Sequence, residues 1–140
     1  MIFVYTNMME YILSIAIQPP SVHSREMSEP ALLARVFAGI SEPTRLHIVL
    51  VLLEGERNVS ELVSVVGASQ GRVSMHLQCL RWCGFVESER RGKYVYYRVR
   101  DERVQQLINL ARAFAASYHH ELASCAVLNH EATRNETEAL

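Results

Sequence analysis

Cysteine is scarce in this 140-residue chain, which contains three, at positions 79, 83 and 125. An odd number of cysteines, without the spacing of a disulfide framework, argues against a secreted scaffold stabilised by disulfides. The thiols are expected to stay free, which requires a reducing compartment. The sequence therefore predicts a cytoplasmic protein.

A long uninterrupted hydrophobic run is also missing. The apolar opening MIFVYTNMMEYILSIAIQPP is interrupted by Glu10, has no Lys or Arg at its start, and ends at two prolines. A membrane span needs about 20 apolar residues, and a signal peptide needs a basic beginning. We expect no membrane partner, and we interpret residues 1–28 as a loosely attached N-terminal extension. A weak interfacial helix is the alternative.

Two features that are common in enzymes do not occur in the sequence. There is no glycine-rich phosphate loop, and no acidic residue or oxyanion device is arranged around a cysteine as nucleophilic catalysis would require. We therefore expect neither an enzyme nor a small-molecule substrate.

The net charge of −1 is unevenly distributed along the chain. Residues 70–100 contain seven Lys and Arg but two acidic residues, whereas residues 1–69 and 101–140 each carry a net charge of −3. A basic segment between acidic ones allows a small protein to bind a polyanion through one face. A solvated charged hairpin would have the same composition.

Helical spacing of apolar residues begins after the extension. Residues 30–40 carry one apolar stripe, and residues 41–56 restart with Ser41 as a candidate cap. A short helix follows, with Ser60 as its candidate cap and Gly67 at its end. Residues 70–83 then form a second short helix, capped by Ser69, with a stripe of Val73, Leu77 and Leu80. Two short helices joined by a tight turn are typical of a helix-turn-helix motif.

The spacing changes from helical to alternating in residues 85–101, FVESERRGKYVYYRVRD, which predicts a β-hairpin with RRGK as its turn. A long amphipathic helix is predicted from Val104 to Leu122. The fold class is therefore mainly α with a small β-hairpin, a dimeric winged helix-turn-helix. We expect residues 29–124 to form the DNA-binding and dimerisation domain and residues 125–140 to form a mobile tail.

In this fold the second helix enters the major groove and the wing follows phosphates. The predicted DNA-contacting residues lie on the outer face, the start and the flank of that helix, and at the hairpin tip. They are Ser69, Gln70, Arg72, Ser74, Met75, His76, Gln78, Arg90, Arg91 and Lys93.

Three segments, SEPTRLHIVLVL, VSELVSVVGASQGRVSMHLQCLR and GKYVYYRV, occur in order between residues 41 and 99. They resemble the ArsR/SmtB family of metal-responsive winged-helix repressors over about residues 30–122. The resemblance implies a homodimer that binds operator DNA without metal and releases it when metal binds. One metal site of the family needs cysteines where this chain has residues 58–61, and another needs ligands where it has Arg103, Phe114 and Ser117. Both sites are therefore expected to be absent.

The cadmium- and lead-sensing CmtR type of this family has two cysteines four apart at the end of the recognition helix and a third beyond the last helix. Cys79, Cys83 and Cys125 match that arrangement. Side chains four apart on a helix have β-carbons about 6 Å apart, so two thiolates can share one metal. In the resembling proteins the third ligand comes from the other subunit. Three thiolates favour Cd²⁺ or Pb²⁺, with Hg²⁺ an alternative and Zn²⁺ a weaker competitor.

Other interpretations of the cysteines remain open at this point. They could form a redox switch on the same DNA-binding fold, or they could simply pack in the core of a DNA-binding regulator. His119 and His120 are candidate accessory ligands, although exposed or dimer-facing positions on the last helix would explain them equally.

Overall fold

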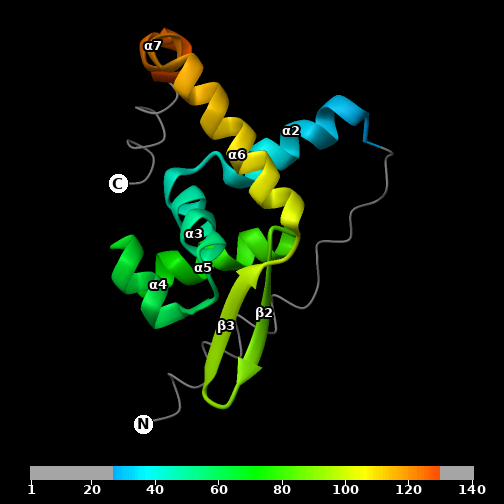
Figure 1. Ribbon diagram of the computed structural model, residues 1–140. Helices are drawn as coiled ribbons and strands as arrows, with labels where there is room; N and C mark the ends of the chain where they lie inside the picture. The colour runs from blue at the N-terminus through cyan, green and yellow to red at the C-terminus, as the bar shows by residue number, and fades with distance from the viewer. Residues whose placement is uncertain (1–26, 130–140) are drawn as a thin grey trace. The chain divides into compact units, whose positions relative to one another are not determined.

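A computed structural model of the chain describes residues 27–129, so residues 1–26 of the expected N-terminal extension and most of the expected tail lie outside the described residues. The helices and strands follow one another as drawn in Figure 1. In chain order they are α2 (Glu29–Ile40), α3 (Pro43–Leu53), β1 (Arg57–Asn58), α4 (Val59–Val66), α5 (Gln70–Trp82), β2 (Val86–Arg91), β3 (Tyr94–Val99), α6 (Glu102–Ser117) and α7 (His119–Ser124). A first compact unit ends at Asp101 and a second begins at Glu102.

The predicted fold class, mainly helical with a small antiparallel sheet, is confirmed. In the first unit α3, α4 and α5 pack on one another, and the β2–β3 hairpin extends from them (Figure 1). Side chains from all of these helices and from the start of β2 close the core. The largest fully buried ones are Ile48, Leu62, Leu77, Leu80, Val49, Val73 and Val86.

Two helix caps differ from the prediction. Helix α3 is capped by Glu42 rather than Ser41, because the Glu42 carboxylate accepts a hydrogen bond of 2.8 Å from the Arg45 backbone N–H. Helix α4 is capped by Asn58 rather than Ser60, because Asn58 and Glu61 each accept the other's backbone N–H. This reciprocal capping box satisfies two N–H groups that a single serine could not. The predicted Ser69 cap of α5 is confirmed.

The sheet has three strands in the order β1-β3-β2, so the predicted hairpin gains a short third strand. Two residues of β1 pair with Tyr97 and Tyr96 of β3, a pairing too short to leave an alternating pattern in the sequence. The hairpin turn is also tighter than expected, because Arg91 pairs with Tyr94 and leaves only Gly92 and Lys93 between the strands. Gly92 has a φ of 63°, which suits a glycine in a two-residue hairpin turn.

The second unit corrects the prediction of one continuous helix from Val104 to Leu122. Helix α6 ends at Ser117, Tyr118 has φ −119° and ψ 32°, and a new helix begins at His119. Residues 126–129 are again helical, within what was expected to be a tail. The apolar spacing continues across Tyr118, which explains why the sequence pattern shows no break there.

Within residues 27–129 no single helix has the length and apolar character to cross a membrane. Helices α2 and α3, which meet at a bend of 80°, have the required length and apolar composition only when they are taken together.

Candidate functional site: recognition helix, wing and thiol pair

Helix α5 is fixed by one buried stripe and leaves its opposite face in solvent. Val73, Leu77 and Leu80 are each 0% exposed. The α4–α5 turn is made by Gly67, whose φ of 72° ends α4 in the left-handed region. Of the predicted DNA-contacting residues on this helix, three are exposed and two are half-buried, while the cap Ser69 is exposed. The exposed three are Gln70, Arg72 and Met75, and the half-buried two are Ser74 and Gln78.

His76 differs from the expectation that it would reach DNA. The residue is buried, 5% exposed, and its Nε2 atom lies 3.5 Å from a carboxylate oxygen of Glu42 at the start of α3. That nitrogen has no hydrogen-bond partner among the described residues. Helical angles alone place this side chain on an open flank of α5, but the start of α3 covers that flank, so the ring is buried rather than open to a phosphate or a base.

The pKa values of His76 and Glu42 are both lowered, which favours a neutral imidazole and a charged carboxylate. Burial lowers the pKa of His76, and the Glu42 carboxylate only partly opposes this effect. Burial would raise the pKa of Glu42, but hydrogen bonds from Arg45 and Thr44 outweigh it and hold that pKa below its ordinary value. A neutral imidazole therefore faces an ionised carboxylate at neutral pH.

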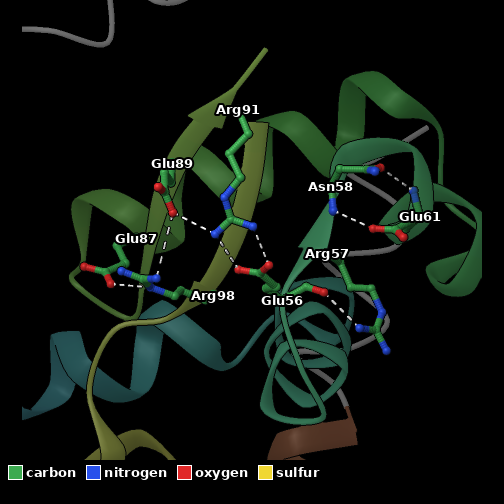
Figure 2. A network of polar contacts seen from close by, with 8 residues as sticks. All are labelled: Glu56, Arg57, Asn58, Glu61, Glu87, Glu89, Arg91 and Arg98. Carbon is green, nitrogen blue, oxygen red and sulfur yellow. Dashed lines mark hydrogen bonds and ion pairs between the residues drawn. The ribbon is translucent and has the colours of Figure 1, made fainter. Parts of the chain in front are cut away.

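The wing supplies two basic side chains at its tip and a third that is already paired. Arg90 and Lys93 are exposed, and Lys93 lies over the Tyr94 ring. Arg91 instead donates to Glu56 at 2.5 and 3.0 Å and to Glu89 at 2.7 Å, as Figure 2 shows. The sequence prediction of Arg91 as a free phosphate contact did not anticipate these partners.

Cys79 and Cys83 lie together at the C-terminal end of α5. Cys79 is half-buried within the helix, whereas Cys83 is exposed and caps it, with its N–H donating to the Cys79 carbonyl at 2.9 Å. Partial desolvation of the Cys83 sulfur and its neighbour Cys79 raise the pKa of Cys83, against the opposing charges of Arg45 and Arg35. The thiols are therefore mutual neighbours, as a shared ligand would require.

Helix α2 approaches this thiol pair through a glycine. A β-carbon on Gly39 would lie 3.7 Å from the Cys83 sulfur and 2.8 Å from the Phe85 ring. Arg45 of α3 fixes the same end of α2, because its guanidinium donates to the Gly39 carbonyl at 2.9 Å and the Ala38 carbonyl at 3.0 Å. The thiol pair thus lies where α2, α3 and α5 meet.

Cys125 belongs to the second unit. It is half-buried and follows α7 as its C-cap, and His119 and His120 lie exposed at the start of that helix. Within residues 27–129 no group of three or more His, Cys, Asp or Glu side chains is arranged to hold a metal ion. Cys79 and Cys83 provide two soft donors, so a complete thiolate site needs a further ligand.

Comparisons with known proteins agree on one family. The family model described as bacterial regulatory protein, arsR family, matches residues 42–88, from the cap of α3 into β2. A probable mercury resistance operon repressor from Streptomyces lividans is 44% identical over 98 residues, which are 70% of this chain and 78% of that protein. The chain belongs to the arsR family. This ArsR-family chain is accordingly a transcriptional regulator rather than an enzyme, as its sequence predicted.

Two further comparisons bear on the subtype and the fold. The transcriptional regulator CmtR from Mycobacterium tuberculosis is 39% identical over 88 residues, covering 63% of this chain and 69% of that protein, which confirms the resemblance to the CmtR type. The homodimeric winged helix-turn-helix DNA-binding domain of a possible ArsR-family regulator from Mycobacterium bovis superposes with a TM-score of 0.58. The two are 31% identical, over 69% of this chain and 96% of that domain. The winged helix-turn-helix prediction is confirmed.

Sequence reasoning missed the residues that support the site. Glu42, Gly39, Arg45 and Glu56 lie before the recognition helix and have no spacing that links them to it. The Glu-Pro pair at the start of α3 was a detectable signal for the Glu42 cap, since proline is favoured in the first turn of a helix. Nothing local in the sequence pairs Glu56 with a residue 35 positions later.

Proposed function

We propose that this ArsR-family protein is a metal-responsive transcriptional repressor that binds operator DNA as a homodimer and releases it when a soft metal ion binds cysteine thiolates. The observation that carries the proposal is the position of the Cys79 and Cys83 thiols, one helical turn apart at the end of the DNA-reading helix, with the Cys83 N–H bound to the Cys79 carbonyl. A ligand held there acts directly on the element that reads DNA.

The DNA-binding part of the proposal uses the exposed side of α5 and the wing tip. Bases are read by Gln70, Ser74, Met75 and Gln78, with Ser69 and Arg72 at the helix start. Arg90 and Lys93 contact phosphate, because basic side chains on a hairpin tip are suited to charge rather than to base edges. Binding is therefore expected to weaken steeply with salt.

The dimer is supported by apolar side chains that the described chain leaves exposed on α2, α6 and α7. They are Leu32, Leu33, Val36, Phe37, Leu110, Phe114 and Leu122. Exposed apolar stripes of this kind favour association of identical copies. The related Mycobacterium bovis domain is homodimeric, which supports the same assembly here.

The metal ligands are Cys79, Cys83 and Cys125, with Cys125 contributed across the dimer as in the proteins that the sequence resembles. A bound soft metal would stabilise the deprotonated thiolates, whose pKa is otherwise raised at Cys83. Cd²⁺ and Pb²⁺ are the preferred ions, with Hg²⁺ and Zn²⁺ as alternatives. Similarity to a mercury resistance repressor supports including Hg²⁺ in every test.

Metal titration followed by charge-transfer absorbance, together with operator affinity with and without metal, tests the proposal. Cys79→Ser and Cys83→Ser should lose tight metal binding yet keep operator binding. Cys125→Ser should keep weaker binding by two thiolates and lose most of the coupling, which is about 1–3 kcal/mol in typical systems. An unchanged metal response in Cys79→Ser would end the metal-sensor proposal.

The free thiols, with Cys83 exposed, also favour a second candidate, a thiol redox regulator on this fold in which Cys125 pairs with Cys79 or Cys83. Oxidant-sensitive DNA release in a protein without affinity for soft metals would support that candidate instead. Metal-independent and oxidant-independent DNA binding would leave the cysteines with a structural role only.

A further inference from the structure

One face of the wing carries a ladder of alternating charges. Glu87, Glu89 and Arg91 occupy every second position of β2, and therefore share a face. Arg98, opposite Glu87 on β3, donates to that carboxylate at 2.6 Å and lies 4.0 Å from Glu89. Figure 2 shows these residues with Glu56, which reaches Arg91 from outside the hairpin.

Arg91 is the most tightly held member of this ladder. Its two terminal nitrogens bind both carboxylate oxygens of Glu56, a fork geometry that is stronger and more directional than a single contact. Glu89 and the Tyr96 ring, 4.9 Å from the guanidinium carbon, bind it further. Hydrogen bonds from Arg91 lower the pKa of Glu56 and of Glu89, so both carboxylates stay ionised at neutral pH.

The ladder changes the electrostatics that the composition predicts for the wing. It contains three carboxylates and two guanidinium groups, so this face is net negative although the surrounding segment is net basic. A phosphate that bound Arg91 would have to displace the Glu56 carboxylate, and it would then lie beside that unpaired carboxylate and beside Glu89. Arg90 projects from the opposite face of β2, so a phosphate can bind it without displacing Glu56.

We propose that Glu56 limits the DNA affinity of the wing by holding Arg91 away from phosphate, which leaves Arg90 and Lys93 as the phosphate contacts. This inference rests on the DNA binding of the proposed function and does not depend on metal. It assigns Glu56, outside both DNA-reading elements, as a positioning residue for Arg91. Removing the Glu56 charge leaves Arg91 with the Glu89 carboxylate and the Tyr96 ring of the hairpin itself, so a phosphate can compete for it.

Two matched pairs of variants test this inference on the full-length protein, by titration of a duplex DNA at several salt concentrations. Glu56→Gln is compared with Glu54→Gln, which makes the same charge change on an exposed side chain two residues away. Arg91→Gln is compared with Arg90→Gln. Circular dichroism and the unfolding midpoint of each variant show that it is folded.

We expect Glu56→Gln to tighten binding relative to Glu54→Gln, by up to about fivefold, the size of one exposed ion pair. Its salt dependence should steepen by about one phosphate contact. Arg90→Gln should weaken binding more than Arg91→Gln does, and adding Arg91→Gln to Glu56→Gln should remove the gain.

Equal affinities within the first pair, or weaker binding by Glu56→Gln, would overturn the inference. So would an Arg91→Gln variant that weakens binding as much as Arg90→Gln, a result that stands even if Glu56→Gln does not fold. A wild-type protein that binds no duplex DNA would overturn the proposed function itself. The salt series on wild type therefore separates the two failures.

Discussion

The apolar stripe of α5 has the same helical spacing as the apolar stripes of α2 and of the C-terminal half of α6, but the opposite exposure. Leu77 is 0% exposed, whereas Phe37 of α2 is 56% exposed and Phe114 of α6 is 57% exposed. Helical periodicity shows that a face needs to be covered, but it does not show what covers it. In α5 the same chain covers the stripe, and in the proposed dimer a second copy covers the other two.

The largest expected effect is on the covered stripe. Leu77→Ala should lower the free energy of unfolding by about 2–5 kcal/mol, because it leaves a cavity in a fully buried position. Met75→Ala on the same helix, at a 57% exposed side chain, should change it far less. Urea denaturation of both variants measures the difference, and equal losses would contradict the assignment of the core.

A smaller effect is expected where α2 meets α5. Gly39→Ala forces a β-carbon to 2.8 Å from the Phe85 ring, so overpacking of about 1–3 kcal/mol should offset the gain in helix propensity. Gly71→Ala, where an added β-carbon meets nothing within 4 Å, should be neutral or stabilising. Thermal unfolding compares the two. Identical changes in the melting temperature of the two variants would mean that α2 does not pack on Phe85.

Substitutions in the exposed apolar stripes should weaken the dimer rather than destabilise the fold of one chain. Phe114→Ala should raise the dimer dissociation constant about tenfold or more, as truncating a large aromatic side chain in an interface core does. Gln105→Ala on the same helix is the control. Sedimentation across a concentration series measures the effect, and a wild-type protein that remains monomeric at micromolar concentration would contradict the dimer.

The smallest expected effect concerns the buried histidine beside the covered stripe. The folded-state pKa of His76 lies below 6.5, so its contribution to stability is present above pH 6.5 and is lost as the pH falls below it. The lowered pKa of Glu42 acts in the same direction, but only below about pH 4.5. Denaturant unfolding between pH 7.5 and 5.5 should therefore show a fall in stability that His76→Gln reduces. An identical slope in that variant would refute the assignment.

Much of the candidate site follows from local sequence, and the exceptions share one cause. The exposed start of α5, the Ser69 cap and the adjacency of Cys79 and Cys83 are consequences of helical geometry, which a single segment specifies. The burial of His76 and the pairing of Arg91 with Glu56 depend on segments that are distant in the chain. No local pattern records such a contact.

The sequence by itself determined the helix-turn-helix, the hairpin after it and the three thiols, because spacing, turn residues and cysteine positions act within a few residues. The tertiary structure alone decided which side chains of the site are buried or already paired within the chain. It turned His76 toward Glu42, brought Gly39 against Cys83, and paired Arg91 with Glu56. Burial and charge pairing depend on which distant segments come together in three dimensions, so only the fold fixes them.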